Sequence, residues 1–312
     1  MKIIQYNKNH KEIWNEFVRN SKNSHFFFLR DYLEYHGDRF EDFSLLVFDD
    51  NNKLIALLPS NKKDNILYSH QGLTFGGFLV NDRMTTEIML SVFENLKIFL
   101  KENIIKKLIY KSIPYIYHLK ASEEDRYALF INNAKIIRRD VTSTINLTEP
   151  IRYSKGRKWI VNKAKKSSIK IECSDDYNSF WQILSELLES GYGVTPTHTL
   201  NEIETLSKLF IKNIKLFLAK KDNVVLSGAI IYENKNIVHT QYLATTQQGK
   251  EVGALDLLID HLINNVYKDK KYFDFGISNE NSGLYLNHGL IAQKEGFGAR
   301  AVVHDFYELE II

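Results

Sequence analysis

The segment Gln247–Ala254 has the residue types and the position expected of a phosphate-binding turn. It contains Gly249, Gly253 and the cation Lys250, and it lies between a strand-like run and a helix-like run. A glycine-containing turn that leads into a helix leaves backbone N–H groups free to bind an anion, and the helix dipole favours negative charge there. An ordinary polar turn has the same composition, so that alternative stays open on local evidence.

Asp274 lies between Phe273 and Phe275 in a second strand-like run. Neighbouring side chains of a strand point to opposite faces, so Asp274 faces away from the core if the two phenylalanines face it. A carboxylate in that position needs a partner or a cationic substrate. Asp274 is therefore a candidate functional residue.

The stretch 155–170 concentrates positive charge and contains no acid. The whole chain has 41 Lys and Arg against 38 Asp and Glu, a formal net charge of +3. Because this stretch alone carries seven positive charges, the rest of the chain is mildly acidic. This distribution argues against a protein that coats nucleic acid. It favours one phosphorylated ligand, such as a nucleotide-linked sugar or a tRNA, and the alternative is a solvated helix face. The basic residues are Lys155, Arg157, Lys158, Lys163, Lys165, Lys166 and Lys170.

Length and composition bound the remaining possibilities. A chain of 312 residues predicts two domains. It has no long apolar run and no signal-peptide core, so we expect a soluble, cytoplasmic protein. The single cysteine and the spacing of the ten histidines predict no metal site. The phosphate-binding P-loop, the nucleophile elbow and the H-E-x-x-H zinc helix are absent.

The elements that must position these residues are clearest in the second half. Apolar spacing of three and four predicts a helix around 180–188, and Thr199 with Glu202 forms a capping box that begins a second helix. The order is two helices, a three-strand meander, then helix, strand, helix and strand. The predicted elements after the first two helices are strands 214–219, 224–232 and 237–244, helix 253–267, strand 272–276, helix 284–294 and strand 301–310.

The first half repeats that order of elements without repeating the residues. We therefore predict two copies of one α/β (α+β) unit, in domains 1–148 and 149–312, with a cleft between them as the default site. The predicted elements are strand 2–5, helices 10–20 and 29–36, strands 44–48, 53–58 and 66–68, helix 85–101, strand 107–111, helix 123–132 and strand 136–147.

This arrangement resembles the GNAT acyltransferase fold, a mixed, mostly antiparallel sheet flanked by helices. In that fold the turn represented here by Gln248, Gly249, Gly253 and Ala254 binds the pyrophosphate of coenzyme A, although the spacing differs here. The tandem arrangement resembles the Fem-type aminoacyl transferases and their acyl-CoA-dependent relatives. The stretches that carry this resemblance are the basic 157–166, the strand-to-turn segment 273–278, and the K-x-x-F-G element 294–298.

The resemblance implies a donor site in the second unit. The donor's pantetheine-like arm would lie in a gap between strands 237–244 and 272–276, and Lys294 would stabilise charge on the acyl carbonyl. The candidate bases are His198, Asp274, His239 and Glu280, of which we favour His198 and Asp274 and interpret His239 as a core histidine. The predicted donor-binding residues are Tyr242, Leu243, Ala244, Gln248, Gly249, Lys250, Gly253 and Ala254.

The predicted acceptor-binding residues combine aromatic, basic and turn positions. Tyr117 and His118 follow Pro114 in an aromatic loop suited to stacking on a sugar or base, although such clusters are more often packing. The glycine-rich segment 69–77 occupies the corresponding place in the first half, where a structural turn is the commoner explanation. The other predicted acceptor residues are Arg157, Lys158, Lys163, Asn279 and Glu280.

The resemblance thus predicts an N-acyltransferase that moves an acetyl group from acetyl-CoA to an amine. The predicted acceptor is a nucleotide-linked amino sugar for cell-surface polysaccharide. One alternative is a Fem-type transferase that uses aminoacyl-tRNA and a peptidoglycan precursor. Another is a binding protein that has kept the fold without catalysis. The oligomeric state is open.

Overall fold

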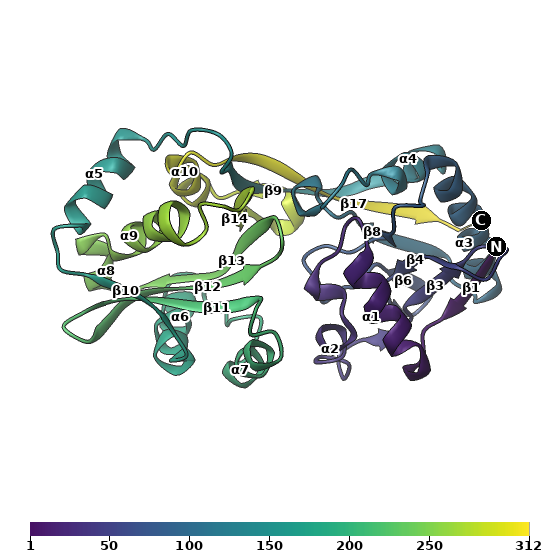
Figure 1. Cartoon of the computed structure of the whole chain (residues 1–312), viewed down its shortest axis with the longest axis horizontal. Coiled ribbons are helices and arrows are strands. Elements are labelled where there is room, and N and C mark those ends of the chain that lie inside the picture. Colours follow the sequence, from purple (N-terminus) through teal and green to yellow (C-terminus); the bar gives the residue numbers. More distant parts are fainter. Residues whose placement is uncertain (312) are drawn as a thin grey trace. The chain divides into compact units, whose positions relative to one another are not determined.

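The computed structural model describes residues 1–311, which form two compact units (Figure 1). Unit 1 comprises Met1–Asp140, Asn279–Tyr285 and the segment that begins at Val303, and unit 2 comprises Val141–Ser278 and Leu286–Val302. Strands β9 (Lys135–Asn146) and β17 (Arg300–Glu310) therefore contribute residues to both units. The division predicted at 148/149 did not anticipate that late segments of the chain join the first unit.

Unit 1 contains two sheets. The first has the order β1-β3-β4-β7 and is antiparallel; the second has the order β17-β8-β6-β5-β2. Thr85 caps the long helix of this unit by accepting the N–H of Ile88, as its place before the apolar periodicity suggests. The strands are β1 (Lys2–Gln5), β2 (Glu41–Asp42), β3 (Leu45–Phe48), β4 (Leu54–Leu58), β5 (Asn61–Lys63), β6 (Ile66–Tyr68), β7 (Leu79–Val80) and β8 (Lys107–Lys111), and the helices are α1 (Lys11–Asn20), α2 (Arg30–Leu33), α3 (Thr86–Glu102) and α4 (Glu124–Ile131).

Unit 2 is built on one sheet with the order β10-β11-β12-β13-β14-β9. Helix α9 covers one face of it, and α6 and α7 cover the other (Figure 1). The core between the sheet and α9 includes Val238, Phe273 and Leu258. The strands are β10 (Lys170–Ser174), β11 (Ile214–Lys221), β12 (Val224–Glu233), β13 (Ile237–Thr245) and β14 (Tyr272–Ile277), and the helices are α5 (Lys155–Ala164), α6 (Tyr177–Tyr192), α7 (Leu200–Leu209), α8 (Gln247–Val252), α9 (Ala254–His261) and α10 (His288–Gly296).

The predicted fold class is confirmed, including the meander β11-β12-β13 and the capping box of Thr199 and Glu202. The predicted start of the last helix, residue 284, is wrong by four residues. Helix α10 begins at His288, where the Asn287 side chain accepts the N–H of Leu290. The preceding residues form the short strands β15 (Asn279–Glu280) and β16 (Tyr285–Leu286), and Ser282 between them has a φ of 54°.

Each unit contains a parallel strand pair of the same form. In unit 1, β6 pairs with β8 from Ile66 to Tyr68, and in unit 2, β13 pairs with β14 from Ile237 to His239. In unit 1 the segment 69–77 follows β6 directly and lies against the end of β8. The side chain of Lys111 holds it there by donating to the carbonyls of His70, Gln71 and Leu73. Unit 2 has no such insertion at this point, and its two strands separate.

Candidate active site

Two β-bulges separate β13 from β14. Opposite β12, the register shifts so that Gln241 is an extra residue in β13. Opposite β9, Phe275 and Gly276 of β14 occupy the interval that Ser143 fills alone. A bulge bends its strand and ends regular pairing. The strands therefore diverge directly after the pair His239 and Asp274, the last one that joins them.

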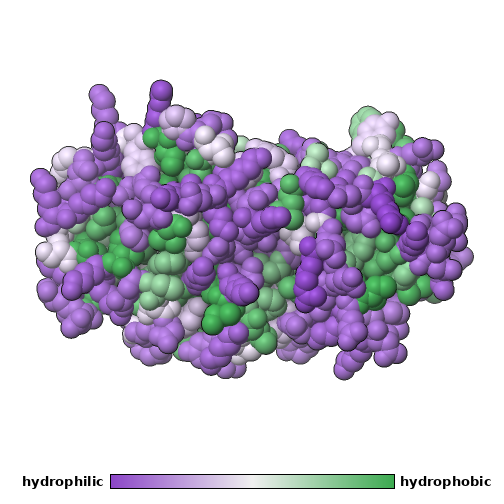
Figure 2. Space-filling model, in the orientation of Figure 1, coloured by the Kyte–Doolittle hydropathy of each residue, from purple (hydrophilic) through white to green (hydrophobic). Residues whose placement is uncertain are grey.

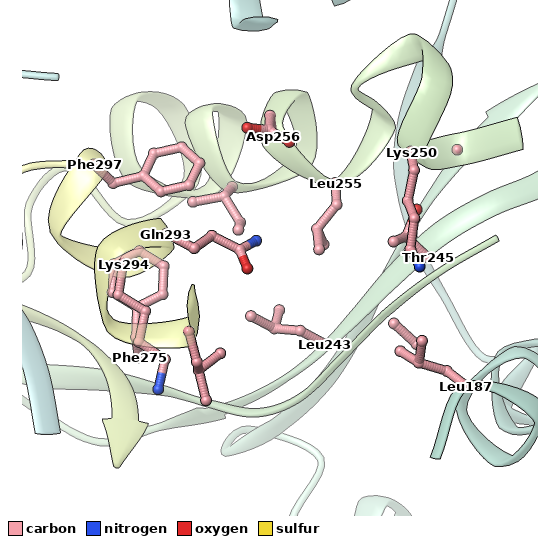
Figure 3. Close-up of a pocket in the computed structure, with 14 residues that line it drawn as sticks. Leu187, Leu243, Thr245, Lys250, Leu255, Asp256, Phe275, Gln293, Lys294 and Phe297 are labelled. Atoms are coloured by element: carbon pink, nitrogen blue, oxygen red, sulfur yellow. The ribbon is translucent and has the colours of Figure 1, made fainter. Parts of the chain in front are cut away.

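A cavity of about 380 Å³ lies between the separated strands (Figure 3). The sequence predicted a gap in this place, and the structure has it. Most of the lining is apolar, and it comes from β13, β14, α6 and the helices on the opposite face of the sheet. The lining residues are Leu187, Leu243, Ala244, Thr245, Gly249, Lys250, Leu255, Asp256, Ile259, Phe275, Leu290, Gln293, Lys294 and Phe297.

Asp274 is fully buried at the point where the gap opens. Its Oδ2 lies 2.8 Å from His239 Nδ1, and its Oδ1 accepts the hydroxyls of Thr142 and Thr144, the latter at 2.9 Å. As predicted from alternation, Asp274 points away from the core that contains Phe273 and Phe275. The partner that the buried carboxylate needs is the histidine that sequence reasoning assigned to the core.

His239 keeps 12% of its side chain exposed, whereas Asp274 has none. An Asp–His contact of this kind fixes the orientation and tautomer of the imidazole. Gly276 lets the ring lie here: its φ is +77°, and a Cβ at this position would stand 3.0 Å from His239 Cε1. No local pattern in the sequence indicated that His239 and Asp274 would be neighbours.

Lys294 belongs to α10 and lines the cavity. Its ammonium donates to the carbonyls of Gly276 and Ile277 at 2.8 and 2.7 Å and to Ser278 Oγ at 2.9 Å. Burial lowers the pKa of Lys294 from 10.5 to about 8, and the negative charge of Asp274 acts in the opposite direction. These three hydrogen bonds fasten the end of β14 to α10, and the predicted role of Lys294 at an acyl carbonyl stays a prediction.

His198 lies against β13 at a different place. Its backbone N–H donates to the hydroxyl of Tyr242 at 3.2 Å, and its Nδ1 lies 2.7 Å from the same oxygen. The Tyr242 ring in turn packs edge-on against Trp181 of α6. Of the two favoured bases, His198 therefore contacts Tyr242, whereas Asp274 contacts His239.

The predicted phosphate-binding turn is a short helix, α8. Thr246 caps it by accepting the N–H of Gly249 at 3.0 Å, and the N–H of Lys250 donates to the carbonyl of Thr246. Both glycines have packing roles: a Cβ at Gly249 would overlap the carbonyl oxygen of Leu226, and one at Gly253 would lie 2.7 Å from Ile160 Cγ2. The open turn predicted here is wrong, because the threonine cap winds it into a helix.

Only some of the predicted donor residues reach the cavity. Leu243, Ala244, Gly249 and Lys250 line the cavity. Ala254 is buried in the core of unit 2, and Gln248 is exposed on α8.

The predicted basic residues on α5 differ in their contacts and in their exposure to solvent. Arg157 pairs with Asp256 of α9, and its guanidinium lies 4.7 Å from the centre of the Phe297 ring. Lys163 donates to the carbonyl of Glu251 at 2.9 Å but remains exposed. Lys158 is exposed as well. Arg157 therefore fastens α5 to α9, and the lysines form the outer surface.

The predicted acceptor residues outside unit 2 do not line its cavity. Tyr117 is 2% exposed and packs on Phe75 with ring centres 4.3 Å apart. His118 Nε2 lies 3.1 Å from the carbonyl oxygen of Ile113, and burial lowers its pKa to about 4. Asn279 and Glu280 form β15, which belongs to unit 1.

Comparison with solved structures identifies the fold. A crystal structure of FemX matches with a TM-score of 0.69 and 12% identity, over 98% of this chain and 97% of that one. L-PGS from Bacillus licheniformis matches with a TM-score of 0.61 and 12% identity, over 97% and 91%. A tandem GNAT protein from the clavulanic acid biosynthesis pathway has a TM-score of 0.51 and 10% identity, over 100% and 98%.

The chain has a tandem GNAT-like fold. No protein-family model and no curated protein matches the sequence. The similarity to GNAT-like proteins is therefore a similarity of structure. Within residues 1–311, no cluster of three His, Cys, Asp or Glu side chains is arranged to hold a metal ion. Among the helices described, none is both long and apolar enough to cross a membrane.

Proposed function

We propose that this chain is an N-acyltransferase that moves an acyl group from a thioester to an amine. The observation that carries the proposal is the contact of His239 with Asp274 at the inner end of the gap between β13 and β14. An enzyme that acylates an amine needs a base beside a channel for an extended donor. Unit 2 supplies both within one strand pair.

The thioester arm lies in the gap, with its acyl carbonyl beside His239. The backbone of β13 after His239 is no longer paired with β14, so it can hydrogen-bond to the arm as to an added strand. Coenzyme A is the simplest molecule with such an arm, and acetyl-CoA is the thioester with which we test the proposal. Lys294 keeps the gap open by holding the carbonyls of Gly276 and Ile277.

In the proposed reaction, the lone pair of a neutral amine attacks the thioester carbonyl carbon. A C–N bond forms, the C–S bond breaks, and the electron pair of that bond leaves with the sulfur. His239 accepts the proton that the amine loses and passes a proton to the thiolate, which becomes a thiol. Asp274 stabilises the imidazolium. The products are an amide and a free thiol, so the step needs no oxidant or metal.

The acceptor stays a prediction, because the amino sugar was inferred from resemblance and no contact in unit 2 selects it. A Fem-type transfer from aminoacyl-tRNA is the competing proposal for the same fold. The two differ in the donor, and donor binding therefore separates them. A location in the cytoplasm is likewise a prediction.

The test is calorimetric titration of the protein with acetyl-CoA and with S-acetyl-pantetheine. We expect saturable binding of both, and we expect Leu243→Arg to abolish it because Leu243 lines the gap. Leu209→Arg is the matched control, since Leu209 is 56% exposed on α7. Absence of thioester binding at millimolar concentration, or equal binding by the Leu243→Arg variant, would refute the proposal.

A further inference from the structure

At the outer end of the cavity, two of the backbone N–H groups that could bind a nucleotide diphosphate are already bonded within the chain. Lys250 and Lys294 lie at opposite sides of the cavity (Figure 3), so α8 marks the end away from His239. The N–H groups of Gly249 and Lys250 are already bonded to Thr246. Glu251 adds a carboxylate to the same helix. The cavity can therefore take a donor's arm, whereas α8 keeps fewer N–H groups for the pyrophosphate of coenzyme A than an open turn would.

Helix α5 borders this outer end. Gly253, between α8 and α9, has no Cβ and so admits Ile160 of α5, and Lys163 bonds to the carbonyl of Glu251. Arg157 of α5 pairs with Asp256, which lines the cavity. A molecule that rests on α5 is thus placed beside the entrance for its arm.

The outward face of α5 combines an aromatic ring with positive charge. Trp159 is 65% exposed, and the Lys163 ammonium lies 5.6 Å from its ring centre. Lys155 is exposed one helical turn before Trp159, and Lys158, next to Trp159 in the chain, is exposed as well. The surface over α5 is mostly hydrophilic (Figure 2). An exposed tryptophan among cations is typical of a docking site for an acidic partner.

The chemistry of the cavity limits what such a partner can insert. Gln293 extends its amide among apolar side chains that include Leu243, Leu255 and Phe297 (Figure 3). A narrow aliphatic chain that carries amides matches this lining, because its methylenes contact the leucines and one amide pairs with Gln293. The charged, hydroxyl-rich 3′ end of an RNA would leave several polar groups without partners there.

We propose that α5 docks an acidic acyl carrier protein, whose phosphopantetheine arm enters the gap between β13 and β14. This inference rests on the proposed function and names the carrier of its donor. The carrier contributes the affinity that coenzyme A would obtain from a pyrophosphate cradle. Charge attraction to the lysines of α5 orients the carrier, and Trp159 supplies the apolar contact.

The experiment compares the binding of four probes by calorimetry: an acetylated bacterial acyl carrier protein, the same carrier without its arm, acetyl-CoA and S-acetyl-pantetheine. We expect the acetylated carrier to bind at least tenfold more tightly than acetyl-CoA. The variant Lys155→Glu/Lys158→Glu, and separately Trp159→Ala, should weaken carrier binding at least tenfold. Neither should change the binding of S-acetyl-pantetheine.

The matched control is Lys208→Glu/Lys212→Glu, a double charge reversal at two exposed lysines of unit 2 outside α5. It should leave carrier binding unchanged. A carrier that binds no more tightly than acetyl-CoA overturns the inference but not the proposed function, provided that a thioester binds. Binding of unacylated tRNA that depends on Lys155 and Lys158, with none of the carrier, overturns it in favour of RNA. No binding of any thioester overturns both proposals.

Discussion

His239 Nδ1 lies 2.8 Å from Asp274 Oδ2 across the last residue pair that joins β13 to β14. One residue later each strand has begun to leave the other, and the cavity begins. The two side chains meet because the strands are parallel and in register up to this pair. The same geometry that ends the pairing therefore places the His239 imidazole at the point where the cavity begins.

Replacing Asp274 with Asn should lower the rate of acyl transfer without loss of thioester affinity. An amide keeps the shape but cannot stabilise the His239 imidazolium, so we expect a fall of about 10²–10⁴-fold. The measurement is thiol release from acetyl-CoA in the presence of a panel of amines. Thr144→Val, which removes one hydrogen bond to Asp274 and leaves the His239 contact, is the control and should cost less than tenfold. Equal rates for Asp274→Asn and wild type would exclude the role of Asp274.

Gly276→Ala should destabilise unit 2 and displace His239. The φ of +77° at Gly276 disfavours any Cβ, and the added methyl group would press on the imidazole ring. We expect a loss of about 1–2 kcal/mol in the free energy of unfolding. Gly156→Ala is the matched control in α5, where nothing lies within 4 Å of the added Cβ. It should raise stability by about 0.5–1 kcal/mol, and chemical denaturation compares the two.

Lys294→Met should change how stability depends on pH. Burial lowers the folded-state pKa of Lys294 to about 8, so between about pH 8 and 10.5 the unfolded chain binds more protons than the folded one. The wild type therefore gains stability as pH rises through this window, by up to ~3 kcal/mol. The variant should lack that gain in urea denaturation at pH 7.5 and 10. Parallel pH curves for the two proteins would contradict this account.

His70→Asn should reduce the acid sensitivity of unit 1. Burial, and the nearby His36, Lys111 and Arg30, lower the pKa of His70 to about 3, so the neutral form is favoured in the folded state. As pH falls from 6.5 towards 3, the unfolded chain binds a proton that the folded chain rejects, and stability is lost.

Asn suits this position because the φ of residue 70 is 65°. Urea denaturation at pH 4.5 and 7.5 should show a smaller loss for His70→Asn than for wild type. His288→Asn, at an exposed position, is the control and should behave like wild type. An unchanged loss in His70→Asn would show that the buried imidazole is not its cause.

Most elements of the fold could be predicted from the sequence because their signals are local. The strands predicted at 2–5, 66–68 and 107–111 are β1, β6 and β8, with the same bounds. The capping box of Thr199 and Glu202 located the start of α7. Their order then indicated the tandem GNAT-like fold. Helix α8 was missed because one hydrogen bond from Gly249 to Thr246 decides between a helix and a turn of the same composition.

The candidate site followed only in part from the sequence. Alternation within β14 indicated that Asp274 needs a partner, since that depends on neighbouring residues alone. Its partner could not be identified, because His239 is 35 residues away and reaches Asp274 through the register of a parallel strand pair. Likewise, the type of Lys294 suggested a catalytic role, whereas its three acceptors depend on how α10 packs against β14.

The sequence by itself determined most of the helices and strands, their order, and a carboxylate on the polar face of a core strand. The tertiary structure alone decided which histidine meets that carboxylate, where the strands part, and which lysines of α5 remain exposed. The physical reason is the distance along the chain over which each interaction acts. Caps and periodicity act within a few residues, whereas bulges at Gln241 and Gly276 take effect only when β13 and β14 lie beside β12 and β9.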